Sequence, residues 1–356
     1  MGSATTATGS SGCSRASSSR PSRASEGQGA LSMIRADRPA LFRLRPSWLP
    51  PAPRALLALI LPLLAAASVP AALAGQRAHL NPVIATLEAG EIVYGLSTQD
   101  LSLAYAREAA RAPVDFLYID MEHSPIDLAA LRTFLLAMGD KEMVLSRGTV
   151  RPNVALLARF APPALQSEWI VKQALDLGLY GVIFNGVDTP GEAAFAVSTM
   201  RYPQLRDSRY PEPVGIRGVS AGNAAWAWGV SSAEYVERAD LWPLNPDGDL
   251  LAVMMIESVE GLRNVDAIAA TPGVGALFPG AGGDLSRSLG VPRDSPELEA
   301  AFQEILAACL ANDVACAITA TTGEDVARRV REGWRIIRTT VDAADASRVI
   351  LGEAAP

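Results

Sequence analysis

The feature that most limits the fold of this chain is a regular alternation of short apolar runs with helical patterns, which begins at Gln76 and continues for about 280 residues. Eight runs have the composition of strands, and they cover residues 93–97, 116–120, 156–160, 181–185, 251–257, 276–279, 315–319 and 335–340. The helical patterns between them cover residues 101–111, 127–138, 167–177, 191–200, 261–270, 296–312 and 323–332. Continuous apolar strands that alternate with helices are typical of a parallel sheet, and eight of them close a barrel. We therefore predict an α/β fold, a (β/α)8 TIM barrel.

One stretch interrupts this alternation. Residues 201–249, called here the 201–249 segment, contain Trp226, Trp228, Trp242 and several prolines, and they are too long for a connection between a strand and a helix. Long connections in compact domains usually have a function. The segment is expected to be either a lid over the site or a contact between subunits.

The first 75 residues have a different composition. Residues 1–32 are mostly Ser, Gly, Ala and Thr with scattered Arg, which predicts a disordered leader. Residues 33–75 combine basic positions with the uncharged run ALLALILPLLAAASVPAALAG, which ends in an A-x-A cleavage pattern. This region is predicted to be a signal peptide, with a retained membrane anchor as the alternative. The protein is then periplasmic or secreted, and residues 76–356 form its folded domain.

Charge and cysteine content exclude several classes of protein. Eight basic and two acidic residues precede residue 76, which leaves 23 basic and 36 acidic residues in the folded domain. So acidic a domain repels a phosphate backbone, which argues against nucleic-acid binding. The chain has three cysteines, and the seven-residue separation of Cys309 and Cys316 is unlike a zinc or redox pair. Both are therefore interpreted as packing residues.

Charged side chains cluster at the ends of four predicted strands. The catalytic groups of a (β/α) barrel lie at the carboxyl ends of its strands, and here those ends carry Asp120, Glu122, His123, Arg159, Glu257 and, just beyond a strand, Asp284. Each could instead be a structural ion pair or, for His123, a structural histidine. Because burying an unpaired charge is costly, four such ends on one rim favour a site.

The residue types in this cluster indicate its chemistry. Glu257 and Asp284 are hard oxygen ligands of the kind that suits Mg²⁺ or Mn²⁺. Arg159 is suited to a carboxylate or enolate oxygen. The turn PGAGGDLS, which leads into Asp284, offers backbone amides that a small anion such as a substrate carboxylate could approach.

The motifs DFLYIDMEHSP, MIESVEGLRNVDAIAATPGVGALF and GDLSRSLGVP, in this order, resemble those of one enzyme family. The chain is similar over about residues 80–345 to the pyruvate-dependent class II aldolases of the 4-hydroxy-2-oxoheptanedioate aldolase (HpcH/HpaI) type, which are related to the citrate lyase β subunit and the malyl-CoA lyases. The resemblance implies a barrel of the phosphoenolpyruvate/pyruvate type. It also implies that Mg²⁺ or Mn²⁺, with Co²⁺ as a third option, is held by Glu257 and Asp284.

The same resemblance implies roles for the other residues. His123, paired with Asp176, would transfer a proton, and Arg159 would stabilise the enolate oxygen. Residues Asp120 and Glu122 would line the pocket, and amides near Gly283 and Asp284 would hold the carboxylate of the oxo acid. The chain departs from the family pattern in having Met255 in place of a glutamine and Asn185 in place of a proline, and in a longer turn before Asp284.

These observations predict a metal-dependent lyase that cleaves a 4-hydroxy-2-oxo acid to pyruvate and an aldehyde. A CoA-ester lyase of the same superfamily is one alternative, although the sequence shows no basic cluster for a CoA diphosphate. An exported protein that binds a 2-oxo acid without turnover is the other. The partners are expected to be the small oxo acid and aldehyde, a membrane only if the leader is uncleaved, and further copies of the chain, which the resemblance implies form a hexamer.

Overall fold

The strands of the protein close into a barrel. A computed structural model describes residues 77–352. Its barrel strands are β1 (Val93–Thr98), β2 (Phe116–Met121), β3 (Ala155–Phe160), β4 (Gly181–Phe184), β6 (Leu250–Met255), β7 (Ala276–Phe278), β8 (Ala315–Thr319) and β9 (Ile336–Arg338). All neighbours are parallel, and closure comes from the pairings of β1 with β9 and of β4 with β6. The predicted (β/α)8 barrel is confirmed, and each of the eight predicted strands is present.

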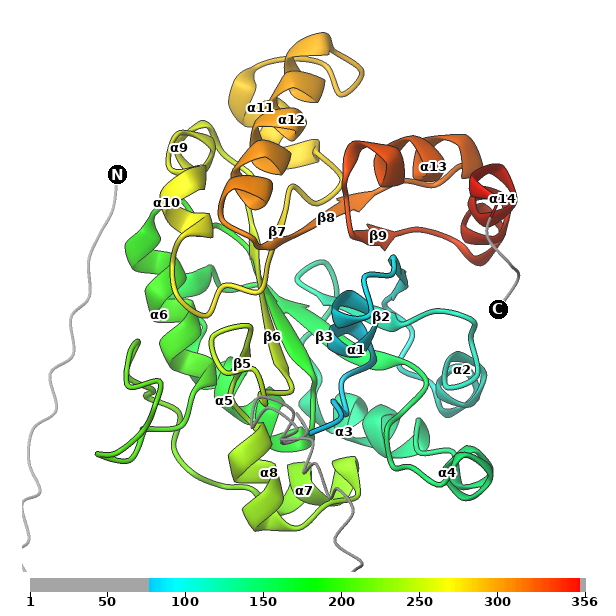
Figure 1. Ribbon diagram of the computed structural model, residues 1–356, viewed down its shortest axis with the longest axis vertical. Helices are drawn as coiled ribbons and strands as arrows, with labels where there is room; N and C mark the ends of the chain where they lie inside the picture. Colours follow the sequence, from blue (N-terminus) through cyan, green and yellow to red (C-terminus); the bar gives the residue numbers. More distant parts are fainter. Residues whose placement is uncertain (1–76, 353–356) are drawn as a thin grey trace, which may run out of the picture. The chain divides into compact units, whose positions relative to one another are not determined.

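Helices surround these strands (Figure 1). They are α1 (Pro82–Glu88), α2 (Leu103–Ala109), α3 (Leu128–Ala137), α4 (Lys141–Arg147), α5 (Glu168–Leu177), α6 (Pro190–Met200), α7 (Gly222–Trp228), α8 (Ser232–Arg238), α9 (Val259–Arg263), α10 (Val265–Ala269), α11 (Gly283–Leu289), α12 (Pro296–Ala311), α13 (Gly323–Glu332) and α14 (Val341–Leu351). Side-chain caps start many of them; Thr189 and Glu192, for example, form a capping box on α6. The sequence did not predict α1, α4, α7, α8, α11 or α14.

The predictions for the leader fall outside the described residues. These are the disordered stretch at 1–32 and the signal peptide or anchor at 33–75. Within residues 77–352, no helix combines the length and the apolar character that crossing a membrane requires.

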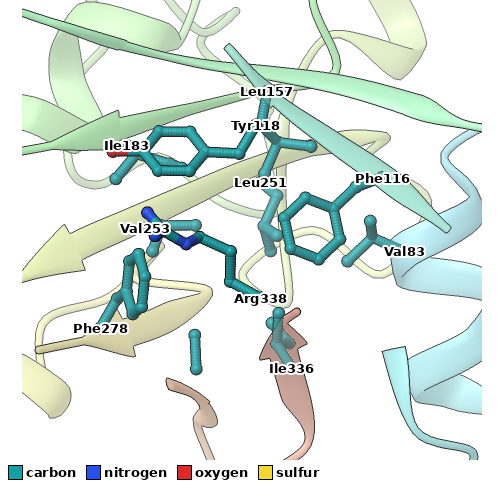
Figure 2. A pocket seen from close by; sticks show the side chains of 11 residues that line it. Val83, Phe116, Tyr118, Leu157, Ile183, Leu251, Val253, Phe278, Ile336 and Arg338 are labelled. Carbon is teal, nitrogen blue, oxygen red and sulfur yellow. The ribbon is translucent and has the colours of Figure 1, made fainter. Parts of the chain in front are cut away.

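The two-residue period of the strands determines which side chains enter the barrel. On β2, Phe116 and Tyr118 point inward, and on β9 Ile336 and Arg338 do the same (Figure 2). A void of about 20 Å³ remains among these interior side chains. Extending the same period toward the carboxyl ends places the next inward residue of β2, Asp120, at the mouth of the barrel, above the apolar interior.

The 201–249 segment folds against the amino-terminal ends of the strands and is not a lid over their carboxyl ends. It contributes α7, α8 and the two-residue strand β5 (Leu241–Trp242), which pairs with the start of β6. Trp228 is buried, stacks on Tyr180 with ring centroids 4.4 Å apart, and donates a hydrogen bond to the Gly178 carbonyl at 2.8 Å. Since Gly178 and Tyr180 directly precede β4, this contact lies at the end of the barrel opposite the predicted site.

The interpretation of Cys309 and Cys316 as packing residues was wrong. They form a disulfide bond that connects α12 to β8, with Cα atoms 5.8 Å apart. Both are buried, as the packing interpretation required. However, because the tight turn between α12 and β8 returns the chain on itself, it brings the two side chains into contact, which sequence spacing alone does not reveal.

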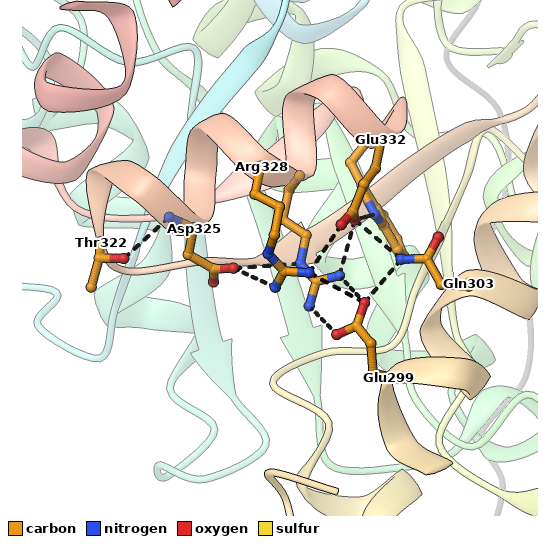
Figure 3. A network of polar contacts seen from close by, with 8 residues as sticks. Glu299, Gln303, Thr322, Asp325, Arg328 and Glu332 are labelled. Carbon is orange, nitrogen blue, oxygen red and sulfur yellow. Dashed lines mark hydrogen bonds and ion pairs between the residues drawn. The ribbon is translucent and has the colours of Figure 1, made fainter. Parts of the chain in front are cut away.

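An ion-pair network joins α12 to α13 on the outside of the barrel (Figure 3). Both guanidinium nitrogens Nη1 and Nη2 of the buried Arg329 donate to the Glu299 carboxylate, at 2.6 and 2.7 Å. Arg328 and Glu332 extend the network on the exposed side. Burial raises the pKa of Glu299, but the hydrogen bonds from Arg329 and Gln303 outweigh it and lower that pKa to about 2.

We expect Glu299→Gln to destabilise the protein by about 1–2 kcal/mol at pH 7, a value reduced for the partial exposure of Glu299. A carboxyl whose pKa is lowered by folding stabilises the folded state above its unfolded pKa of 4.5, and this contribution is lost as the pH falls toward 2. Urea unfolding at pH 7 and pH 3 measures the effect. Glu304→Gln, at an exposed position on the same helix, is the control. An equal loss of stability at both pH values would contradict the prediction.

Candidate active site

The carboxyl ends of the strands enclose a cavity of about 260 Å³. Its lining consists of Tyr118, Asp120, His123, Arg159, Met255, Glu257, Phe278, Gly280, Ala281, Gly283, Asp284, Arg293 and Arg338. Six residues predicted from the sequence are therefore brought together, namely Asp120, His123, Arg159, Glu257, Gly283 and Asp284. Two of them lie at the ends of strands β2 and β3, and the others lie in the segments that follow β2, β6 and β7. Closure of the barrel brings these segments together.

Arg159 is buried at the end of β3 and held by two carboxylates. Its Nε and Nη2 atoms donate to Asp120 at 3.2 and 3.0 Å, and its Nη1 lies 2.6 Å from Glu122 Oε2. Burial raises the pKa of Asp120, but the hydrogen bonds from Arg159 outweigh burial and leave that pKa below its usual value. The guanidinium is therefore fixed in position, and its charge is balanced before any ligand binds.

Glu122 connects Arg159 to His123. Its Oε1 accepts a hydrogen bond from Asn185 Nδ2 at 2.6 Å, and its Oε2 lies 3.5 Å from Nε2 of His123. Asn185 is buried at the end of β4, and sequence reasoning noted it only as a departure from the family pattern. It positions Glu122. The His123 side chain is 61% exposed, which leaves its ring open to a ligand in the cavity.

Glu257 and Asp284 face the same cavity, Glu257 just after β6 and Asp284 in the first turn of α11. Burial raises the pKa of Glu257 to about 7, and the negative charges of Asp284 and Glu122 add to the shift against the opposing charge of Arg159. Because both carboxylates border one cavity, they are candidates for holding a cation together. Two oxygen ligands, with further positions left for water and substrate, fit Mg²⁺ or Mn²⁺.

The turn before Asp284 depends on glycine. Gly280 and Gly282 have φ angles of 59° and 72°, in the left-handed region that other residues avoid. A Cβ atom on Gly280 would also lie 2.8 Å from Cε of Met255 and 3.6 Å from Oε1 of Glu257. The turn therefore packs against the side of the cavity that carries Glu257. Within residues 77–352, no three or more His, Cys, Asp or Glu side chains are grouped as a complete metal site.

The structure does not bring Asp176 to this site. Asp176 lies near the end of α5, where it forms ion pairs with Lys172 at 3.2 Å and with the buried Arg217 at 2.9 Å. A helix that follows β3 runs back toward the amino-terminal ends of the strands, so the end of α5 is remote from His123. Within one copy of the chain, the structure therefore does not place Asp176 beside His123. The carboxylate beside His123 is Glu122.

Sequence reasoning missed three other residues of the cavity. Tyr118 precedes Asp120 by two positions and shares its inward face on β2. Arg338 ends β9, two residues before the end of the strand predicted at residues 335–340. Arg293 is exposed and lies against Gly283, since a Cβ there would be 2.1 Å from its Nη2 atom. The signal for Tyr118 and Arg338 was the strand period itself.

Comparison with known proteins agrees with this arrangement. A solved structure of a HpcH/HpaI aldolase/citrate lyase family protein from Burkholderia cenocepacia J2315 superimposes with a TM-score of 0.60 at 29% identity, over 76% of this chain and 98% of that one. The hydroxypyruvate/pyruvate aldolase of Paraburkholderia phytofirmans is 31% identical over 264 residues, which are 74% of this chain and 92% of that protein. The 5-keto-4-deoxy-D-glucarate aldolase of Salmonella paratyphi C is 30% identical, with 74% and 91% covered.

The match to the family as a whole covers most of the barrel. Residues 96–348 match the family described as HpcH/HpaI aldolase/citrate lyase, and this range contains every residue of the cavity. Its relatives are carbon–carbon lyases that act on small molecules. The chain belongs to the HpcH/HpaI aldolase/citrate lyase family.

Proposed function

We propose that the protein is a divalent-metal-dependent aldolase that cleaves a 4-hydroxy-2-oxo acid to pyruvate and an aldehyde, and that also catalyses the reverse addition. The observation that carries this proposal is that Glu257 and Asp284 share one cavity with Arg159 and His123. The aldolase activities of the relatives support it. A cavity of about 260 Å³ has the size for a small oxo acid and a short aldehyde.

Glu257 and Asp284 are the residues that would hold the cation. When bound, Mg²⁺ or Mn²⁺ would act as a Lewis acid toward the oxo acid and favour its enolate form. The turn at Gly283 and Asp284 borders the cavity, and contact between its amides and the oxo-acid carboxylate remains part of the proposal.

Arg159 and His123 supply the remaining chemistry. Arg159 would place a fixed positive charge near the enolate oxygen, and Asp120 and Glu122 keep its guanidinium oriented. In cleavage, His123 would take the proton from the 4-hydroxyl group as the C3–C4 bond breaks, and would pass it to C3 of the resulting enolate to give pyruvate. In the reverse addition it would take the methyl proton of pyruvate and return it to the new hydroxyl group, which is why pyruvate proton exchange reports on His123. Glu122, 3.5 Å from the imidazole, would orient the ring in the role first expected for Asp176.

Two assays test the proposed reaction. The purified protein with Mg²⁺ or Mn²⁺ should exchange the methyl protons of pyruvate for deuterium in D₂O, as followed by NMR, and should form an aldol product from pyruvate and glycolaldehyde. A chelator should stop both reactions. Tight pyruvate binding without exchange would instead favour a binding protein, and undiminished activity with chelator present would overturn the metal requirement.

We expect His123→Gln to slow pyruvate proton exchange and aldol cleavage by about 10²-fold or more, which is the usual contribution of a general acid–base group. Glutamine keeps the size and polarity of the side chain but cannot carry the proton. Because His123 is not a proposed ligand of the cation, Mn²⁺ affinity measured by calorimetry should not change. A variant with wild-type exchange rates would remove His123 from the mechanism.

We further propose that the protein is exported. The Cys309–Cys316 disulfide supports this, because such bonds persist mainly in oxidising compartments. Amino-terminal sequencing of the protein isolated from its cells should show cleavage after Ala74. An intact leader on a cytoplasmic protein would contradict the proposal.

Self-association is also proposed, with a hexamer as the state that the family resemblance implies. Val219 and Trp226 in the 201–249 segment are 65% and 78% exposed, and large exposed apolar side chains are typical of contact surfaces. Light scattering of the purified protein tests it, and a monomer at micromolar concentration would contradict it.

A further inference from the structure

Arg338 occupies an unusual position at the end of β9. It pairs in register with Gly95 of β1 and with Thr319 of β8, and its side chain points into the barrel above Ile336. Figure 2 shows its guanidinium group extending across the interior toward Val253. Arg338 lines both the interior void and the active-site cavity. It therefore belongs to the floor of that cavity, by which we mean the side that faces the barrel interior.

The charge of Arg338 is not balanced. Among the described residues, none forms a hydrogen bond or an ion pair with its guanidinium. The Tyr118 ring lies beside it, with 5.7 Å from the Cζ atom of Arg338 to the ring centroid. Arg159 lies on the same ring at 5.5 Å, but Asp120 and Glu122 neutralise it. Two guanidinium groups thus share one aromatic ring, and among the described residues no carboxylate contacts that of Arg338.

This arrangement should attract a negatively charged ligand. Burial lowers the pKa of Arg338 and the like charge of Arg159 adds to that effect, and together they outweigh the opposing influence of Tyr118 and Asp120. A guanidinium nevertheless stays protonated in proteins, so the free-energy cost of the half-buried charge cannot be removed by losing the proton. An anionic oxygen bound at the floor would remove this free-energy cost and would accept charge-assisted hydrogen bonds from Arg338.

Met255 leaves this side of the cavity without a hydrogen-bond donor from β6. Met255 lies on the inward face of β6, two residues before Glu257, and borders the same cavity as Arg338. Its sulfur lies 3.8 Å from Nη1 of Arg159 and is a weak acceptor that cannot donate a hydrogen bond to a carboxylate. The part of the substrate next to the cation ligands would therefore lack a donor from β6, and Arg338 can supply one.

We propose that Arg338 binds a carboxylate oxygen of the 2-oxo acid from the floor of the cavity and makes the polar contact that Met255 cannot make. Arg338 is then a positioning residue that sets affinity for the oxo acid. This inference rests on the proposed function for the identity of the ligand, but it is tested by binding and does not require turnover.

Calorimetric titration of the Mn²⁺-loaded protein with pyruvate tests the proposal. We expect Arg338→Met to weaken pyruvate binding by about 10- to 100-fold, the value of a charge-assisted hydrogen bond, and Arg338→Lys to weaken it less. Arg335→Met is the matched control, because Arg335 precedes β9 and its guanidinium donates to the Glu91 carbonyl outside the cavity. Unchanged pyruvate affinity in Arg338→Met would overturn the proposal.

Two further measurements separate this role from a structural one. Pyruvamide, which lacks the negative charge, should lose little affinity in Arg338→Met, so the preference for pyruvate over pyruvamide should shrink; an equal loss for both ligands would contradict a carboxylate contact. Adding Met255→Gln to Arg338→Met should restore part of the pyruvate affinity. If Arg338→Met does not fold, the affinities of Arg338→Lys for pyruvate and pyruvamide are compared instead. Wild-type pyruvate affinity in Arg338→Lys would count against the proposal.

The same experiments distinguish the two hypotheses. Weakened pyruvate binding in Arg338→Met, together with a wild-type protein that shows no proton exchange, would refute the aldolase function and keep the Arg338 contact. Normal proton exchange by the wild type, together with unchanged pyruvate binding in Arg338→Met, would support the aldolase function and refute the Arg338 contact.

Discussion

We expect Glu257→Gln to lose tight binding of Mg²⁺ and Mn²⁺ and to lower the rate of pyruvate proton exchange by about 10³-fold. Glutamine fills the same volume, so the cavity should keep its shape. The substitution removes one of the two negative charges that would attract the cation. The remaining carboxylate, Asp284, is exposed to solvent and would hold the cation weakly on its own. Calorimetry with Mn²⁺ and proton exchange followed by NMR measure the two effects.

Glu260→Gln provides the control for this prediction. Glu260 is exposed in the first turn of α9, three residues after Glu257, and does not line the cavity. Its replacement should leave metal binding and exchange unchanged. Exchange at the wild-type rate by Glu257→Gln with chelator present would show that the two carboxylates do not hold a catalytic cation.

Much of the fold and of the cavity could be predicted because both follow from the strand period. Buried parallel strands are continuous apolar runs, and the sequence shows each of them within a few residues of its observed bounds. Once the strands were located, Asp120, Arg159 and Glu257 followed as the polar residues at their carboxyl ends. Barrel closure then explains why residues more than a hundred positions apart line one cavity.

The errors arose where a motif was interpreted without its place in the barrel. Asp176 was assigned to His123 by resemblance, but it belongs to the end of a helix that runs away from the site. Arg338 is absent from the prediction because the predicted strand at 335–340 places it inside the strand, whereas β9 ends at Arg338. The Cys309–Cys316 bond depends on the path of a turn, which neither composition nor spacing specifies.

The 201–249 segment shows a further limit of sequence patterns. Its aromatic residues suggest a functional segment but do not indicate at which end of the barrel it lies. Trp228 packs on Tyr180 beneath β4, whereas Trp226, two residues earlier on α7, is 78% exposed. Two tryptophans on one short helix thus lie on opposite kinds of surface, one buried and one exposed. Which of them is buried depends on which side of α7 packs against the barrel.

Glu257 should also make the metal-free protein less stable as the pH rises. Its pKa is about 7 in the folded protein against an ordinary value of 4.5. A carboxyl whose pKa is raised by folding binds its proton more tightly in the folded state, so ionisation favours unfolding. The destabilisation is absent below about pH 4.5, grows between pH 4.5 and 7, and is complete above pH 7.

We therefore expect metal-free Glu257→Gln to be more stable than the wild type at pH 8, by about 1–3 kcal/mol, and the difference to be much smaller at pH 5. Urea unfolding in the presence of a chelator measures both values, with Glu260→Gln again as the control. An equal difference at the two pH values would mean that the Glu257 charge is not the cause. Saturating Mn²⁺ at pH 8 should reverse the order, since a bound cation would stabilise the wild type through the same carboxylate charge that destabilises it when no cation is bound.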